Sequence, residues 1–338
     1  MDHSTATEKA RLRYREAIYL GQWPEGEKIP DERSLARRDS ISRVTVRSAL
    51  KPLEKAGLLI RRQGHGTRVR LNAPATFAQP RLIAAVSPGN HSFFGEFIRH
   101  LEQHAAKTGG LVLYKHWSLQ SLPLEQTLWQ LYINGIRHVV IWPEDQSVPA
   151  DLLRRAAAIG IQPILFDLRL PLPTCPTVSL DNPRAIGGLL RALKNPRQAV
   201  YVGWDHPGLS SLAEREAAFR KFCPAGKVIR LPWNLHRGPA EEIVPVLTPL
   251  FKPLPPGLPV VGSDGGTGHC SAVALRVLSK NNPLASVDRL PPHKNRRLIC
   301  CEQPLQAIAR KMIHCLTHPI PPTDQDKYHR IPGKIITL

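Results

Sequence analysis

Residues 28–69 constrain the fold of this chain more than any other stretch, because start and stop signals for several short elements follow one another there. Asp31 predicts the start of a helix over residues 31–38, since its carboxylate accepts backbone N–H bonds that the first helical turn leaves unpaired. Ser42 is a second capping residue. It predicts a helix over residues 43–55, whose apolar side chains recur at helical spacing at Val46, Ala49, Leu50 and Leu53.

A short hairpin follows these two helices. Gly57 ends the second helix, and an apolar strand begins at Leu58. Gly64 and Gly66 bracket a turn, because glycine adopts the backbone angles of tight turns without steric cost, and residues 67–69 return as the second strand. The sequence therefore predicts a small unit of helix, tight turn, helix and hairpin.

Arginine is concentrated in this unit with few acids beside it, at Arg33, Arg37, Arg38, Arg43, Arg47, Arg61, Arg62, Arg68 and Arg70. Arg43 and Arg47 lie four residues apart at the start of the second helix, so both point to one face. Arginine pairs bidentately with guanine in the major groove of DNA, while a helix N-terminus and hydroxyl groups bind phosphate. The order of the elements favours a DNA-reading helix over the alternative, a solvated basic helix on an ordinary domain.

Residues 8–70 resemble the winged-helix DNA-binding domain of the GntR family of bacterial transcription regulators. The matching pieces are YREAIYLGQWPEGEKIPDERSLARR, SISRVTVRSALKPLEKAGLL and the wing RRQGHGTRV. The resemblance implies DNA contacts at Arg33, Ser42, Arg43, Thr45, Arg47, Gln63, Gly64 and His65. Pro52 departs from the family pattern, and we expect it to bend or loosen the recognition helix downstream of the base-reading turn.

Composition and charge narrow the class of protein. The formal net charge of +19 favours a polyanionic partner. No apolar run approaches the roughly 18 residues of a membrane-spanning helix, and the N-terminus lacks the apolar core of a signal peptide. The six cysteines form no C-x-x-C pair, so we expect buried thiols in a reducing cytoplasm rather than a zinc or redox site. No metal and no cofactor is predicted.

The rest of the chain follows a different pattern. Residues 72–80 are short, polar and flanked by proline, which predicts a linker after an N-terminal domain over residues 1–71. From Arg81 onward, strands alternate with helices in two successive series, which predicts parallel sheets built from βαβ units. The predicted fold class is therefore α/β: a winged helix-turn-helix domain, then a two-lobed Rossmann-like domain over residues 81–338.

Residues 81–338 resemble the periplasmic-binding-protein-like effector domain of LacI-type repressors. The matching pieces occur in family order: AAVSPGNHSFFGEF, ILFD, TVSLDNPRAIGGLLRAL, SSLAEREAAFRKF, VVGSDGGTGHCSAVALRVL and CCEQPLQAIARKMIHCL. In that family a sugar or similar polar metabolite lies in the cleft between the lobes. The resemblance implies a ligand site made by Ser87, Phe94, Asp167, Arg215, Asp264 and Gln303.

Each of these residue types has a chemical reason to hold a sugar. Asp167 and Asp264 follow apolar strands, where a carboxylate can accept hydrogen bonds from paired hydroxyl groups. Arg215 offers a fork of donors, and Phe94 can stack on the apolar face of a sugar. The alternative is that the acids cap the next helix and that Arg215 forms a surface ion pair.

Two segments depart from the LacI-type pattern. The glycine-rich turn after Asp264 is longer than usual, so Thr267 or His269 can take its place in the site. Residues 278–297 are rich in proline and basic residues, and a family segment is expected to be missing there. The turn also lacks the spacing and lysine of a phosphate-binding loop, and no G-x-S-x-G motif supports a hydrolase.

Together these patterns predict a bacterial, cytoplasmic, one-component transcription regulator that is not an enzyme. Its predicted partners are double-stranded operator DNA, a second copy of the chain, and a small effector, a sugar or sugar derivative, that relieves repression. No membrane partner is expected. Two alternatives stay open: a regulator whose second domain is only a dimerisation scaffold, and a DNA-binding domain fused to an enzyme such as an aminotransferase.

Overall fold

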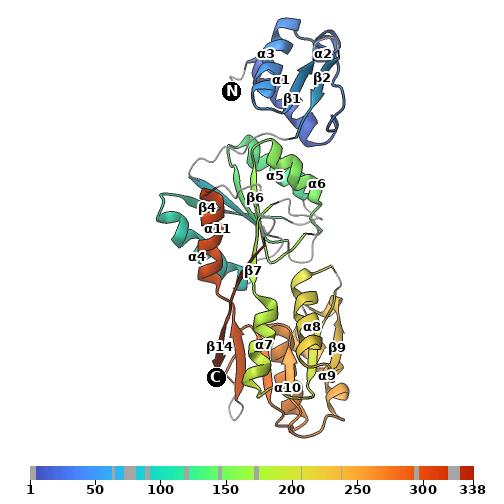
Figure 1. The fold of residues 1–338 in the computed structure, drawn as a ribbon, viewed down its shortest axis with the longest axis vertical. Helices are drawn as coiled ribbons and strands as arrows, with labels where there is room; N and C mark the ends of the chain where they lie inside the picture. The colour runs from blue at the N-terminus through green and yellow to red at the C-terminus, as the bar shows by residue number, and fades with distance from the viewer. Residues whose placement is uncertain are drawn as a thin grey trace. The chain divides into compact units, whose positions relative to one another are not determined.

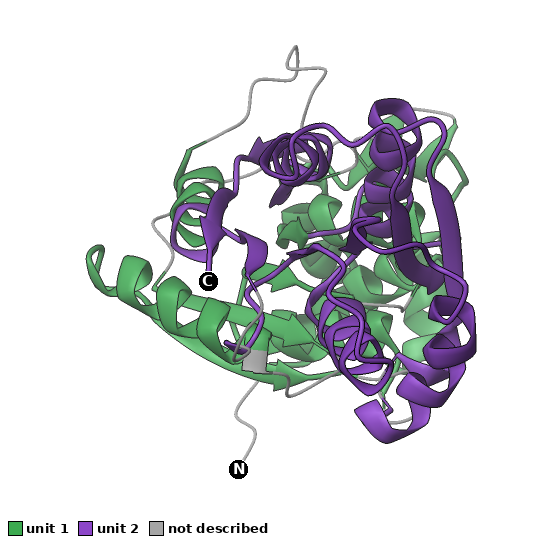
Figure 2. Ribbon diagram, turned by 90° about the horizontal axis from the view of Figure 1, so that it is seen from below, with its two compact units in different colours: residues 1–166, 170–177, 309–327 green, residues 167–169, 178–308, 328–338 purple. Residues whose placement is uncertain are grey.

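The structure, a computed structural model, describes residues 5–62, 65–71, 81–87, 92–117, 122–143, 147–170, 175–206, 208–236, 238–292, 297–318 and 328–338. Two compact units contain them (Figure 2). The first unit comprises residues 1–166, 170–177 and 309–327, and the second comprises residues 167–169, 178–308 and 328–338. The predicted linker over residues 72–80 lies outside the described residues.

The N-terminal part of the first unit is a winged helix (Figure 1). Its elements are α1 (Ala6–Tyr19), α2 (Glu32–Asp39), α3 (Arg43–Lys55), β1 (Leu59–Arg62) and β2 (Gly66–Val69). Asp31 caps α2, because its carboxylate accepts hydrogen bonds from the backbone N–H groups of Arg33 and Ser34, both at 2.9 Å. Ser42 caps α3 in the same way through Thr45, at 3.0 Å. Both predicted helix starts are confirmed.

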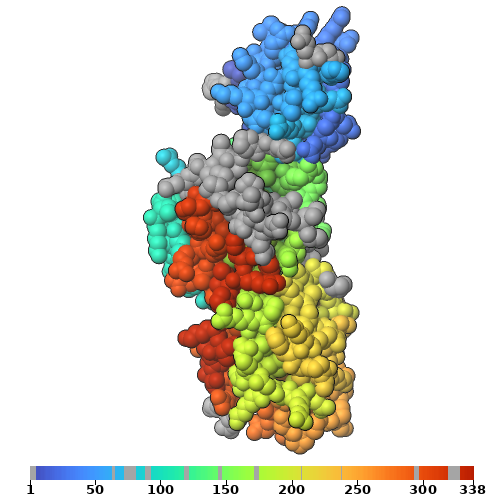
Figure 3. All heavy atoms as spheres, viewed as in Figure 1, coloured from blue at the N-terminus to red at the C-terminus, as the bar shows by residue number. Residues whose placement is uncertain are grey.

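Apolar side chains from all three helices form the centre of the winged helix. Leu35 of α2 and Val46 of α3 are fully buried, as is Tyr14 of α1. The strands β1 and β2 pair antiparallel, and Gly66 adopts a positive φ of 81° where β2 begins. The assigned helix α3 continues through Pro52. In the space-filling view the atoms of this part, in blue, form one closely packed body (Figure 3).

A parallel sheet forms the rest of the first unit, with the strand order β6-β5-β3-β4. The strand β3 is buried on both faces, which is typical of parallel sheets covered by helices. The elements are β3 (Leu82–Ser87), α4 (Ser92–Ala106), β4 (Leu111–His116), α5 (Leu124–Ile133), β5 (His138–Ile141), α6 (Ala150–Ala158) and β6 (Gln162–Phe166). Most of α11 (Leu305–Thr317) also belongs to this unit.

The second unit is built on a six-stranded sheet with the order β14-β12-β11-β10-β8-β9, in which only β14 runs antiparallel to its neighbour. Its elements are β7 (Thr177–Leu180), α7 (Asn182–Ala192), β8 (Val200–Asp205), α8 (Ser210–Phe222), β9 (Lys227–Pro232), the 3₁₀ turn η1 (Trp233–Leu235), α9 (Ala240–Phe251), β10 (Val260–Gly262), α10 (Gly265–Val277), β11 (Leu284–Val287), β12 (Leu298–Glu302), β13 (Tyr328–Ile331) and β14 (Lys334–Thr337).

Successive side chains of this sheet pack into two separate cores. Val260 of β10 lies in a cluster with residues of α9 and α10, whereas the next residue, Val261, lies in a cluster with residues of α7 and α8. This alternation follows from the two-residue period of a strand. The predicted α/β fold class is confirmed.

One prediction about this unit is wrong. Residues 278–297, where a missing segment was expected, contain the strand β11, which pairs between β10 and β12 near the centre of the sheet. Four buried residues after Pro283 carry too weak a periodic signal to outweigh the surrounding prolines and charges. The helix α10 begins at Gly265, directly after its capping residue Asp264.

We predict that Gly268→Ala destabilises the second unit. A Cβ atom on Gly268 would lie 2.3 Å from the hydroxyl oxygen of Ser286 in β11. Overpacking of this kind costs about 1–3 kcal/mol. Gly266→Ala in the same helical turn is the control, since its Cβ would lie no closer than 3.2 Å to any neighbour. Thermal unfolding should show a lower Tm for Gly268→Ala only, and equal values would contradict this packing.

Candidate functional site

The start of α3 presents an exposed basic face. Ser42, Arg43 and Arg47 are exposed, and the apolar Val44 between them is 71% exposed. The hydroxyl groups of Ser42 and Thr45 lie 2.8 Å apart, so the cap itself fixes the first turn of the helix. All nine arginines singled out in the sequence are exposed. Such a face can neutralise several phosphates while one helix N-terminus approaches base edges.

Arg47 is held by an acid that the sequence analysis did not single out. Its guanidinium donates to both carboxylate oxygens of Glu32 in α2, at 3.2 and 2.7 Å. Arg61 of β1 donates to the same carboxylate at 3.2 Å. These hydrogen bonds, that from Arg47 first, lower the pKa of Glu32 below its usual value. Glu32 therefore ties the recognition helix to α2 and to the wing.

The other predicted DNA-contacting residues divide into two groups. Arg33 in α2 and His65 beside the wing are exposed. The backbone N–H of His65 donates to the carbonyl oxygen of Arg62 at 3.0 Å, which closes the turn between the two wing strands. Gln63 and Gly64 lie outside the described residues.

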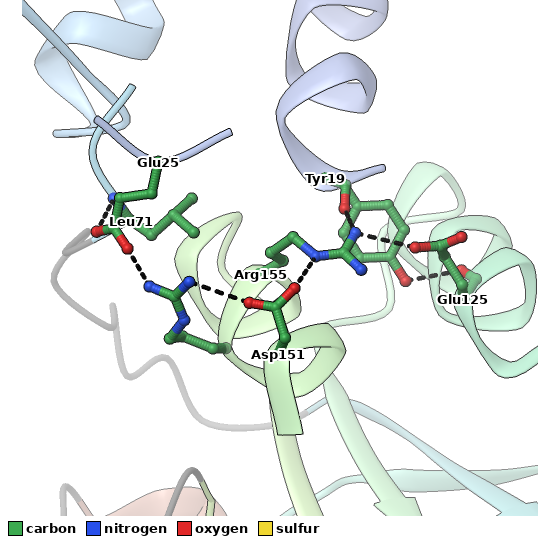
Figure 4. Close-up of polar contacts among 7 residues, drawn as sticks. Tyr19, Glu25, Leu71, Glu125, Asp151 and Arg155 are labelled. Atoms are coloured by element: carbon green, nitrogen blue, oxygen red, sulfur yellow. Dashed lines mark hydrogen bonds and ion pairs between the residues drawn. The ribbon is translucent and has the colours of Figure 1, made fainter. Parts of the chain in front are cut away.

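Within the first unit, the winged helix contacts α5 and α6 through polar groups (Figure 4). The Tyr19 hydroxyl donates to the backbone oxygen of Glu125 at 2.7 Å, and the Tyr19 ring stacks on Trp129 with centroids 5.5 Å apart. Arg155 donates to the backbone oxygen of Tyr19, to the Glu125 carboxylate at 2.9 Å and to Asp151 at 2.9 Å. Arg155 is therefore the central donor of this contact.

In the second unit, a buried arginine organises a polar cluster. Arg215 is only 4% exposed. Its Nε donates to the side-chain oxygen of Asn182 at 2.7 Å, and its Nη1 donates to the backbone oxygen of Ser263 at 2.9 Å. Burial lowers the pKa of Arg215, but nearby acidic groups, those of Asp167 and Asp288 first and that of Asp264 as well, outweigh that effect and raise the pKa above its usual value. Arg215 is thus not the surface ion pair of the alternative interpretation.

Two carboxylates of this cluster lie in strained backbone positions. Asp167 has a φ of 60° and Asp288 a φ of 68°, a left-handed conformation that side-chain-bearing residues rarely adopt and that gathers at functional sites. Burial raises the pKa of Asp167 to about 6, against the opposing effect of Arg215. Burial likewise raises the pKa of Asp288. Asp288 was not among the predicted site residues, because β11, which ends one residue before it, has too weak a sequence signal.

Gln303 completes the cluster. Its side-chain nitrogen donates to Asp288 at 2.7 Å. Because a carboxylate only accepts hydrogen bonds, this contact fixes which end of the Gln303 amide faces Asp288. The amide oxygen then lies on the other side, where it is buried without a hydrogen-bond partner among the described residues, as is Oδ1 of Asp167.

Asp264 has a different environment from the other predicted acids. Its carboxylate accepts from the backbone N–H of Thr267 at 2.9 Å, and together they form the capping box that starts α10. It also accepts from the indole of Trp204 at 2.7 Å and from the hydroxyl of Ser263 at 2.6 Å. This is the helix-capping alternative, and it leaves Asp264 and Thr267 engaged with each other. His269 follows within α10 and is partly buried.

Two predicted ligand residues lie in the first unit. Ser87 ends β3 and is fully buried. Phe94 is 1% exposed and stacks on Trp142, with ring centroids 5.0 Å apart. A ring inside a core has no free face for a sugar, so the structure does not support the stacking role predicted for Phe94. The neighbouring Phe93 is partly exposed.

A cavity of about 360 Å³ in the second unit touches the predicted site only through Trp204, whose indole donates to Asp264. It is bounded by β8, α8 and Arg230 of β9, and none of the predicted ligand residues lines it. Its main charged groups are already paired, since Glu216 accepts from Arg220 at 2.9 Å and from Arg230 at 2.7 Å. The cavity therefore adds no evident binding group to the Arg215 cluster.

Other kinds of site find no support among the described residues. No group of three or more His, Cys, Asp or Glu side chains there could hold a metal ion. All six cysteines are buried and free, as predicted. In the described part of the chain, no helix combines the length and apolar character needed to cross a membrane.

The fold defines a class of protein: a winged helix-turn-helix joined to an α/β domain of the kind found in LacI-type regulators and periplasmic binding proteins. Residues 6–69 match the family model of bacterial regulatory proteins of the gntR family. The N-terminal domain is therefore a gntR-type winged helix, and the resemblance inferred from the sequence is confirmed.

Curated relatives are transcription regulators. The arabinose metabolism transcriptional repressor of Geobacillus stearothermophilus is 26% identical over 177 residues, which cover 51% of this chain and 48% of that protein. The HTH-type transcriptional regulator GgaR of Escherichia coli strain K12 is 27% identical over 160 residues, or 45% of this chain and 58% of that protein. The chain thus spans about half the length of the curated relatives it matches.

Solved structures share the fold of the remainder. The trehalose repressor from Escherichia coli has a TM-score of 0.59 and 15% identity, covering 77% of this chain and 100% of that chain. The Cra transcriptional dual regulator from Pseudomonas putida, in complex with fructose 1-phosphate, has a TM-score of 0.60 and 17% identity, covering 76% of this chain and 98% of that chain. At these identities the likeness establishes the fold alone.

The raised pKa of Asp167 predicts a pH-dependent stability. The pKa of about 6 in the folded protein exceeds the value of about 3.9 in an unfolded chain. Between these values the folded state binds more protons, so the free energy of unfolding falls as the pH rises, by up to about 1.4 kcal/mol per unit of pKa difference. Asp167→Asn should remove this fall, so that the slope of Tm against pH between pH 4 and 6 becomes more positive than in the wild type.

The control is Asp205→Asn, which changes an exposed carboxylate at the end of β8. Its curve should stay parallel to that of the wild type. If the Asp167→Asn curve is parallel as well, the burial assigned to Asp167 is wrong.

Proposed function

We propose that this protein is a sequence-specific DNA-binding transcription regulator, a repressor, whose DNA affinity is controlled by a small sugar-like effector. The observation that carries the DNA-binding part is the exposed Arg43 in the first turn of α3, beside the Ser42 cap and the basic wing. An exposed helix start of this kind can enter the major groove. The regulatory part is supported by the similar proteins, a sequence relative that represses arabinose metabolism and a structural neighbour that is a trehalose repressor.

The effector site in this proposal is the cluster of Asp167, Arg215, Asp288 and Gln303. It combines a rigidly held guanidinium with carboxylate and amide oxygens, which is the polar chemistry that recognises hydroxyl groups. Asp264 is left out, because its carboxylate is engaged in capping α10. No catalytic group is assigned, and we propose that the protein is not an enzyme.

The regulator acts as a homodimer in this proposal, because a pair of winged helices matches a two-fold operator. The strand β4 offers a surface for a second copy. It ends the sheet of the first unit, and its side chains Leu111, Leu113 and Tyr114 are 70%, 42% and 37% exposed. An apolar edge strand of this kind is normally covered. Because its proposed partner is DNA, the protein acts in the cytoplasm in this proposal.

Control of DNA binding needs a physical link between the α/β domain and the winged helix. The contact of Arg155 with Tyr19 and Glu125 provides one, because it joins the end of α1 to α5 and α6 within the first unit. An effector changes DNA affinity only if it binds two arrangements of the protein with different affinity, typically by about 1–3 kcal/mol. We propose that the contact of Arg155 with Tyr19 and Glu125 differs between these two arrangements.

Arg43→Ala should weaken specific DNA binding by about 10- to 100-fold without lowering Tm, because one base-reading side chain is worth about 1–3 kcal/mol. The target sequence is first obtained by selecting bound duplexes from a random library with the wild-type protein. Competition with unrelated DNA then measures specificity. Arg276→Ala, in the last turn of α10, is the matched control. Undiminished specificity in Arg43→Ala would contradict the assigned recognition helix.

Arg155→Ala should loosen the winged helix from α5 and α6, because it leaves the Tyr19 carbonyl and the Glu125 carboxylate without their shared donor. Amide hydrogen exchange at the end of α1 and in α5 is expected to accelerate several-fold, while exchange in the second unit stays unchanged. Arg99→Ala, an exposed arginine of α4, is the control. Equal protection in both variants would show that the contact does not hold the two parts together.

A further inference from the structure

The cluster in the second unit is acidic although the chain as a whole is strongly basic. The chain carries a formal net charge of +19. Around Arg215, however, three carboxylates act on one guanidinium, those of Asp167, Asp288 and Asp264. The other arginines nearby, Arg169 and Arg330, both approach the carboxylate of Glu214, at 4.0 and 3.1 Å. Four carboxylates thus surround three guanidinium groups, and the cluster has a surplus of one negative charge.

The hydrogen-bonding groups that lack a partner in this cluster are acceptors. Oδ1 of Asp167 and Oε1 of Gln303 are buried and have no hydrogen-bond partner among the described residues. A buried acceptor without a donor costs about 1–3 kcal/mol, so a bound molecule that supplies donors is favoured at both atoms. Hydroxyl groups supply donors, whereas phosphate and carboxylate groups supply only further acceptors at neutral pH.

The donors of the cluster are largely engaged within the protein. Two of the three guanidinium nitrogens of Arg215 donate to Asn182 and to the backbone of Ser263. The amide nitrogen of Gln303 donates to Asp288. A phosphate placed here would meet two carboxylates and compete for donors that already have acceptors, so its electrostatic gain from Arg215 is offset.

We propose that the effector of this protein is an uncharged polyhydroxyl compound, and that the Asp167–Asp288 pair excludes phosphorylated and acidic sugars. The inference rests on the proposed effector site and specifies its ligand class. Asp167 and Gln303 accept from hydroxyl groups of the ligand, while Arg215 positions the two carboxylates.

The test is a thermal-shift and calorimetry comparison of the full-length protein with matched compounds. Common pentoses, hexoses and disaccharides are each paired with their sugar phosphate and sugar acid, in about 0.2 M salt to screen non-specific attraction to the basic surface. We expect stabilisation by an uncharged member, with a Kd at least 10-fold lower than that of its phosphate. A phosphate or acid that binds as tightly as its uncharged parent overturns the inference and leaves the effector function standing.

Variants test whether Asp167 is responsible for the preference for uncharged over phosphorylated sugars. Asp167→Asn keeps the shape but replaces one acceptor oxygen by a donor, so it should weaken the uncharged ligand about 10- to 100-fold and narrow the discrimination against its phosphate. Asp205→Asn is again the control and should change neither. Unchanged affinities in Asp167→Asn overturn the inference. Silence of the wild type toward every compound, with DNA binding intact, overturns the effector function itself and favours a dimerisation scaffold.

Discussion

The burial of the Arg215 guanidinium is the constraint on which the second unit depends. An isolated charge inside a protein is costly, and it persists only where carboxylates and hydrogen-bond acceptors surround it. Here the guanidinium is surrounded by groups from four separate parts of the chain: Asn182, the Ser263 carbonyl, Asp167 and Asp288. Ends of several strands and the start of α7 must therefore meet at α8. The same requirement explains why Asp167 and Asp288 remain in left-handed backbone positions.

The two proposed binding sites have opposite local charge: the DNA-binding face is basic, and the effector site is acidic. The winged helix exposes its arginines, which suits a polyanion, and Glu32 organises two of them without removing their exposure. The Arg215 cluster instead gathers carboxylates out of water, which suits hydroxyl groups. Net charge alone would have suggested an anionic ligand everywhere on this chain. Burial and pairing of particular residues, rather than composition, decide what each surface recognises.

Sequence reasoning succeeded where a signal is local and failed where packing decides. Asp31 and Ser42 were predicted as caps because a cap depends on the three residues that follow it. Asp264 satisfies the same local rule, and its capping alternative describes its contacts, although the family resemblance pointed to a ligand role. Phe94 and Phe93 are indistinguishable in sequence. Both rings contact Trp142, and only the tertiary structure shows that Phe94 is the more deeply buried.

The sequence by itself determined the winged helix, the alternation of strands and helices, and most of the candidate residues, because caps, glycine turns and apolar periodicity act over a few residues. The tertiary structure decided which of those residues belong together. It added β11 and Asp288, joined Arg47 to Glu32, and linked Tyr19 to Arg155. These contacts join residues far apart along the chain, so no local pattern could reveal them. The charge and hydrogen-bond state of a buried site depends on such distant partners.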